Sequence, residues 1–155
     1  MMPNRDPLRA LVVAESSRLN PSYMPWWRPP PGFRSFNPAQ SLALPAIGIT
    51  SAVVTLPVPL GYDGVILRLS HRSTAMFVDG DLIWRLQADG RPIRNYGNLS
   101  VEFGPPNNPV STDGILIYSG QTINYLVNNV ALAGAGVFII CSLGGYFWPK
   151  GVESW

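Results

Sequence analysis

Few side chains in this sequence belong to types that carry out chemistry. It has one histidine, His71, and one cysteine, Cys141. A Ser-His-Asp arrangement is defined by geometry that a sequence does not show, so we interpret His71 as a residue at the end of a strand. Cys141 lies in the apolar run Val137–Leu143. Burial there raises the pKa of a thiol, so we expect Cys141 to be reduced and unreactive.

The acidic residues fall mostly in predicted turns. Asp79-Gly80-Asp81, with Asp89 nearby, comes closest to a metal site, but calcium takes about six to eight oxygen ligands and the spacing of a calcium loop is absent. Aspartate and glycine are typical of hairpin turns, which is our interpretation of these residues. Glu102 is the one acid predicted to lie on a strand, so paired carboxylates for glycoside hydrolysis are not indicated. The sequence predicts no catalytic residue, cofactor or metal ligand, and no enzyme.

The composition limits the classes of partner. Charged residues make up 13% of the chain and the net charge is +2, which is too little for the basic stripe of a nucleic-acid-binding protein. No apolar run reaches the roughly 18 residues of a membrane span, and Leu11–Ala14 is too short for a signal peptide. Sparse charge predicts that other protein covers much of the surface, as in a homo-oligomer.

The sequence pattern around these side chains predicts β-strands. Ile115, Ile117, Ile123, Tyr125 and Val127 recur at every second position, and Ser119-Gly120 lies between them as a turn. The run Val137–Leu143 lacks alternation, which predicts a strand buried on both faces, with a buried helix as the competing interpretation. Elsewhere in the chain, turn residues recur about every 8–12 residues, which is the spacing typical of short strands joined by turns. Strands are expected at 49–56, 65–70, 81–86, 98–103, 115–117, 123–127 and 137–143.

The fold class predicted is all-β, a single antiparallel β-sandwich over residues 48–155 preceded by an extended arm over residues 1–47. Nine of the 16 prolines lie in the arm, and a short helix is expected within Leu8–Leu19. The arm is rich in aromatic residues, unlike disordered segments, so we expect it to lie against its own domain or a neighbour's. Its predicted interaction residues are Tyr23, Trp26, Trp27, Arg28, Phe33, Arg34 and Phe36.

A second class of function would use aromatic side chains as a platform for sugars. Trp84, Tyr96, Tyr118 and Trp148 are available for this. A tryptophan on a strand lies in the core more often than on a platform. A carbohydrate- or receptor-binding β-sandwich module is therefore the alternative to an assembly protein.

The block Pro57–Trp148 resembles the small jelly-roll virion proteins of tailed bacteriophages. The resemblance rests on Leu56–Val65 at the start of the sandwich, Gly80–Arg85 within it, and Ser119–Ile123 followed by Gly144–Pro149. It implies a non-enzymatic structural protein that decorates or cements the capsid or forms the neck collar, and that binds through arms and loops. It also implies contact with other copies and with major capsid or neck proteins, and a location in the virion after synthesis in the host cytoplasm.

Overall fold

The computed structural model describes residues 29–30, 32–105 and 107–151. These residues form strands joined by turns and loops, without a helix. The strands are β1 (Arg34–Phe36), β2 (Ala39–Ala43), β3 (Thr50–Pro57), β4 (Tyr62–Ser73), β5 (Leu82–Ala88), β6 (Arg91–Pro92), β7 (Val110–Ile117), β8 (Thr122–Asn129) and β9 (Phe138–Pro149).

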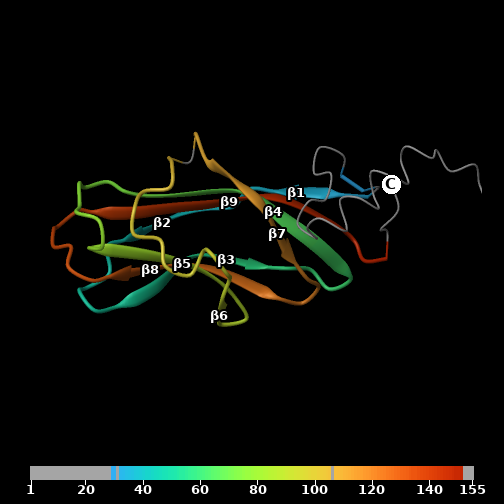
Figure 1. The fold of residues 1–155 in the computed structure, drawn as a ribbon, viewed down its shortest axis with the longest axis horizontal. Coiled ribbons are helices and arrows are strands. Elements are labelled where there is room, and N and C mark those ends of the chain that lie inside the picture. Colours follow the sequence, from blue (N-terminus) through green and yellow to red (C-terminus); the bar gives the residue numbers. More distant parts are fainter. Residues whose placement is uncertain (1–28, 31, 106, 152–155) are drawn as a thin grey trace, which may run out of the picture.

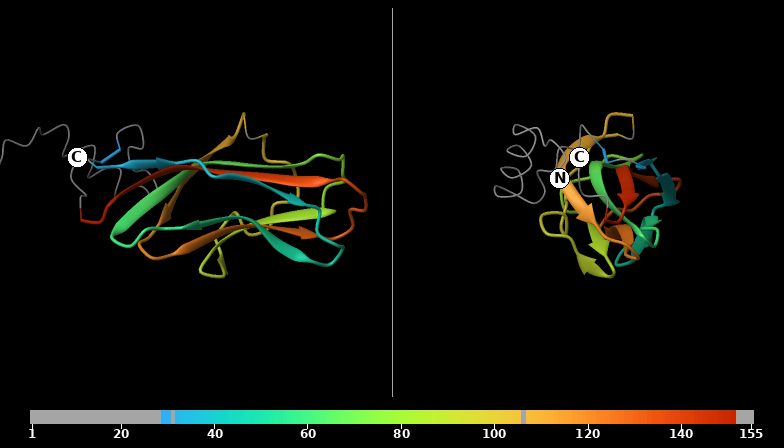
Figure 2. Two further views of the ribbon diagram at one scale, coloured as in Figure 1. Left: turned by 180° about the vertical axis from the view of Figure 1, so that it is seen from behind. Right: turned by 90° about the vertical axis from the view of Figure 1, so that its right-hand side faces the viewer.

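The strands make two antiparallel sheets that lie face to face (Figures 1 and 2). Sheet A has the order β1-β9-β4-β7, with β2 also paired to β9, and sheet B has the order β3-β8-β5-β6. From β2 to β5 and again from β6 to β9, each strand lies in the sheet opposite to the one before it. This is the jelly-roll arrangement of a β-sandwich. It confirms the all-β, antiparallel sandwich predicted from the spacing of apolar and turn residues.

The core lies between the sheets and follows the period of two in the sequence. Alternate residues of β8 point inward, among them Ile123, Tyr125 and Val127, while those between them are only partly buried. Trp84 on β5 and Leu69 on β4 are also fully buried in this core. Because successive side chains of a strand point to opposite faces, one face of each sheet supplies the core.

The last strand is longer than predicted and is not buried on both faces at its start. Ile139, Cys141 and Leu143 face the core, but Phe138 is 45% exposed and Ile140 is half-buried. The prediction of a strand at Val137–Leu143 is therefore confirmed, and so is the burial of its inner face against the second sheet. Its outer face, for which we predicted cover by a terminus or a neighbouring subunit, is only partly covered within the chain itself. Alternation is hidden in the sequence because both faces carry apolar side chains.

The strand predicted at 98–103 does not form. Leu99 makes a single bridge to Trp84 in sheet B, whereas Phe103 donates its backbone N–H to the carbonyl of His71 in sheet A. This segment crosses from one sheet to the other, so it cannot pair along its length with either. Glu102 consequently lies in a loop, and the described acids that lie on strands are Asp63 on β4 and Asp113 on β7.

Part of the predicted arm belongs to sheet A. β1 pairs with residues 145–147 of β9, and β2 pairs with residues 138–142. Between them the carbonyl of Pro38 accepts a 3.0 Å hydrogen bond from the backbone N–H of Leu143. Residues 34–43 thus run along one side of β9 as an edge strand, where a proline is tolerated because half of the strand's N–H groups face away from the sheet. The helix expected within Leu8–Leu19 lies outside the described residues.

Candidate functional site

Three of the seven predicted interaction residues of the arm lie in the described part of the chain, and all three contact the chain's own sandwich. The Phe33 ring lies 6.0 Å from the Tyr146 ring in an edge-to-face arrangement. The Arg34 guanidinium lies 5.1 Å from the centre of the Tyr62 ring, within the range of a cation–π contact. Phe36 packs 4.5 Å from Phe147 at the margin of the core. Tyr23, Trp26, Trp27 and Arg28 lie outside the described residues.

The arm meets a second apolar cluster on the outer face of sheet A. Tyr146 and Trp148 alternate along β9 with Phe147, which faces the core, so they point away from it. Val65 on β4 joins them, and all three are less than a tenth exposed. Burial raises the pKa of Tyr146 to about 12. Sheet A therefore has apolar side chains on both faces at the end where β1 is paired.

His71 lies within β4 and is fully buried, not at the end of a strand as predicted. Its ring is stacked against Trp84, with ring centres 4.1 Å apart, and against Phe103, with ring centres 5.5 Å apart. Nε2 lies 2.6 Å from the carbonyl oxygen of Val101, and Nδ1 lies 2.5 Å from the hydroxyl of Tyr125. Burial lowers the pKa of His71 to about 4, although the Val101 carbonyl acts in the opposite direction. Both ring nitrogens thus have structural partners.

Cys141 is buried beside the same aromatic cluster. Burial raises the pKa of its thiol, and the nearby Trp84 side chain, which carries an N–H donor, offsets part of that effect. The pKa of Tyr125 is likewise raised well above its usual range by burial. A thiol with a raised pKa has little thiolate at neutral pH, so this position favours packing over nucleophilic chemistry.

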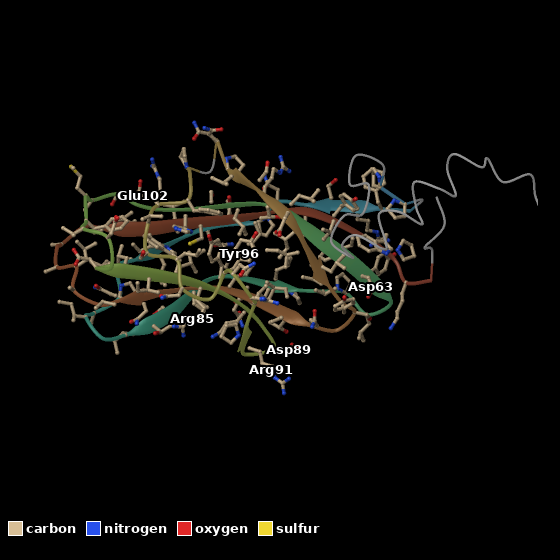
Figure 3. The ribbon with its side chains drawn as sticks, viewed as in Figure 1. Asp63, Arg85, Asp89, Arg91, Tyr96 and Glu102 are labelled. Atoms are coloured by element: carbon tan, nitrogen blue, oxygen red, sulfur yellow. The ribbon has the colours of Figure 1, made fainter. Side chains whose placement is uncertain are left out.

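Asp63, Asp81 and Asp89 each accept a hydrogen bond from a backbone N–H group, and Figure 3 labels Asp63 and Asp89. Asp81 accepts a 3.2 Å hydrogen bond from the backbone N–H of Val78, and Asp89 accepts one of 2.9 Å from that of Thr122. Asp89 itself has a φ of 49°, in the left-handed region that aspartate tolerates in turns. Asp63, at the opposite end of the molecule from Glu102, accepts a hydrogen bond from the backbone N–H of Ser119. Within the described ranges, His, Cys, Asp and Glu form no group of three or more that could hold a metal ion.

The four aromatic residues considered for a sugar platform are not gathered on one surface. Trp84 and Trp148 are buried, one in the core and one in the second apolar cluster. Tyr96 donates its hydroxyl to Asp113 over 2.9 Å and is half-buried. Tyr118 is exposed. No pair of these side chains forms a flat exposed surface on which a sugar ring would stack.

The feature that the sequence did not reveal is a cluster of exposed apolar side chains at one end of the sandwich, which we call the apolar tip. It comprises the loops 44–49, 74–81, 100–103 and 130–137 and the first residue of β9. Of the 11 large apolar side chains that are exposed in the described chain, seven lie there. Met76 and Val78 are the most exposed of them, at 99% and 72%. The other members are Ile47, Ile49, Val101, Val130 and Phe138.

Hydrogen bonds join the loops of the apolar tip to one another. The buried side chain of Asn129 donates to the carbonyls of Pro45 (2.7 Å) and Leu132 (2.8 Å), and it accepts from the N–H of Leu132. The backbone N–H of Val130 donates to the carbonyl of Asp81, and that of Gly80 to the carbonyl of Ser100. Four separate loops that carry exposed apolar residues are thereby held next to one another at one end of the sandwich. The strand order alone brings these loops together, so no sequence pattern marks them as neighbours.

A hollow of about 440 Å³ opens beside the tip, lined by residues 73–77 together with Asp79 and Glu102. Glu102 accepts a 3.2 Å hydrogen bond from the backbone N–H of Ser73 through Oε1. Asp79 forms no hydrogen bond with a described residue. The apolar tip thus includes a concave site with two carboxylates and an apolar wall formed by Met76 and Phe77.

No protein-family model matches this chain, and no curated protein matches it in sequence. The described residues contain no helix that is long and apolar enough to cross a membrane.

Proposed function

We propose that this chain is a non-enzymatic structural component of a bacteriophage particle, an accessory protein that decorates or cements the capsid or forms the neck collar. In this proposal it assembles with copies of itself and with major capsid or neck proteins through its arm and its sandwich surfaces. Its place of action is the virion.

The observation that carries the proposal is the apolar tip. Seven exposed apolar side chains gathered on one end exceed what scattered surface residues require, and such patches are typical of protein-protein contacts. Charged residues are only 13% of the chain, so the surface as a whole is also suited to being covered. Jelly-roll sandwiches are common among the capsid proteins of viruses, although a fold alone does not determine a function.

The arm adds a second argument. Residues 34–43 cover one edge of β9, and residues 1–28 precede this edge strand in the sequence. An extended segment anchored by backbone pairing can reach a neighbouring subunit without needing a core of its own. The side chains expected to make that contact are Tyr23, Trp26, Trp27 and Arg28.

The direct test is to purify particles of the phage whose genome encodes the chain and to analyse them by mass spectrometry and electron cryo-microscopy. We expect a fixed number of copies per particle, with density for a β-sandwich on the capsid or neck. Particles that lack the chain while it accumulates free in the lysate would overturn the proposal. Binding of the free protein to a host glycan, with no copies on the particle, would favour the receptor-binding alternative.

A further inference from the structure

The apolar tip and the described start of the chain lie at opposite ends of the sandwich. β1 pairs with Phe147 and Gly145 near the end of β9, and the position of Gly32 borders the side chain of Pro149. The tip includes Phe138 at the start of β9, a strand of 12 residues and so about 40 Å long. Figure 1 shows β1 at one end and the loops that join β2 to β3, β4 to β5 and β8 to β9 at the other. The described chain therefore begins at the end of the sandwich away from the tip.

The tip and the segment 1–28 are complementary in charge. The charged residues of the tip loops are Asp79, Asp81 and Glu102, and those loops contain no lysine or arginine. The segment 1–28 contains four arginines and two acids, so its formal net charge is +2 (4 − 2). Its arginines are Arg5, Arg9, Arg18 and Arg28.

The two also carry complementary kinds of side chain. A guanidinium on an apolar stem fits the hollow beside Met76, where it would meet the carboxylates of Asp79 and Glu102. Tryptophan and methionine side chains of the segment, such as Trp26, Trp27 and Met24, would cover the exposed aliphatic residues of the tip. A charge-assisted pair surrounded by apolar contact is a common centre of protein interfaces.

We infer that the apolar tip of one copy is the docking site for residues 1–28 of a second copy. The segment can extend over as much as about 90 Å, enough to reach the tip of a copy placed end to end with its own sandwich. Each copy then offers an arm at one end and a receiving surface at the other, which is a head-to-tail contact. A contact of this kind closes into a ring or continues as a filament. This inference rests on the proposed function, since it names the self-contact of that assembly.

The test is photo-crosslinking of the full chain with a benzophenone amino acid at position 76, where Met76 points into solvent. Unlabelled chain carrying the crosslinker is mixed with ¹⁵N-labelled chain that lacks it. We expect crosslinked peptides that join the unlabelled tip to labelled residues 1–28. Crosslinks only to the unlabelled arm, crosslinks only to other surfaces, or no crosslink between chains would each overturn the inference.

Substitutions give a second readout in the same protein. Met76→Asp and Asp79→Lys should each weaken self-association by more than about tenfold in sedimentation velocity, since each alters a central contact. The matched control is Leu60→Asp, because Leu60 is also highly exposed but lies at the opposite end. Equal self-association in all variants would contradict the inference. If the chain is found on particles while the crosslink fails, this inference is wrong and the proposed function stands.

Discussion

The hydroxyl of Tyr125 lies 2.5 Å from Nδ1 of His71, and the other neighbour of that imidazole fixes which of the two donates. Nε2 lies 2.6 Å from the carbonyl of Val101, which only accepts, so Nε2 carries the proton. In a neutral ring Nδ1 is then the acceptor, and Tyr125 donates to it. The pair joins β4 to β8 across the core, and His71 also holds the loop that carries Val101.

The first prediction concerns pH. Because the pKa of His71 is lowered from 6.5 to about 4 by burial, the unfolded chain binds a proton between these values that the folded chain does not. The contribution of neutral His71 to the free energy of unfolding is therefore fully present above pH 6.5, and it is lost as the pH falls toward 4. Urea unfolding should show a loss of roughly 2 kcal/mol between pH 8 and pH 5.

The control for this prediction is His71→Gln, which should show a smaller pH dependence over the same interval. The chain has one histidine, so a single imidazole resonance can be followed by NMR. That resonance should stay at its neutral position down to about pH 5. A midpoint near 6.5 in the folded protein would show that the ring is not buried as described.

The second prediction is that Tyr125→Phe destabilises the fold by roughly 1–3 kcal/mol, because it leaves Nδ1 of His71 buried without a donor. The pKa of His71 should rise, since the lost hydrogen bond stabilised the neutral ring. Chemical denaturation and an NMR titration measure the two effects. Tyr118→Phe removes a hydroxyl from an exposed tyrosine and should stay within about 0.5 kcal/mol. Similar losses in both variants would refute the assigned role of Tyr125.

The third prediction concerns the hydrogen bonds that the Asn129 side chain makes to the loops of the apolar tip. Asn129→Ala leaves the carbonyls of Pro45 and Leu132 and the N–H of Leu132 without their partner, so it should cost about 2–4 kcal/mol. Amide hydrogen exchange at Leu132 should become faster. The adjacent Asn128 is the matched control, because its Oδ1 is buried without a hydrogen-bond partner. If Asn128→Ala lowered the free energy of unfolding more than Asn129→Ala did, the role assigned to the Asn129 hydrogen bonds would be wrong.

Much of the sandwich could be predicted from period two and turn residues, but two kinds of feature could not. The edge strand at 34–43 carries Pro38 and mostly exposed side chains, so it lacks the alternation that marks a half-buried strand. The apolar tip is invisible in the sequence because residues such as Ile47, Met76 and Val130 resemble core residues. Only the jelly-roll order of strands brings their loops together at one end.

The fourth prediction separates two neighbours that the sequence could not distinguish. Ile139→Ala removes a fully buried side chain from the core and should cost about 2–5 kcal/mol. Phe138→Ala removes a side chain that is exposed at the tip and should cost less than about 1 kcal/mol. Thermal unfolding of the two variants provides the measurement. A larger loss for Phe138 would mean that the register of β9 is shifted by one residue.

The last prediction compares two deletions of the arm. Removing residues 1–28 leaves all the described pairing in place, so the protein should stay folded by circular dichroism while its proposed self-association is lost. Removing residues 1–43 also takes away β1 and β2, and with them Phe36 and Leu42, which pack against the core. β9 would then be a bare edge over most of its length, and such edges promote aggregation. We expect this longer deletion to give insoluble or unstable protein. A soluble, stable chain lacking residues 1–43 would show that the edge strand is dispensable and that the sandwich is complete without it.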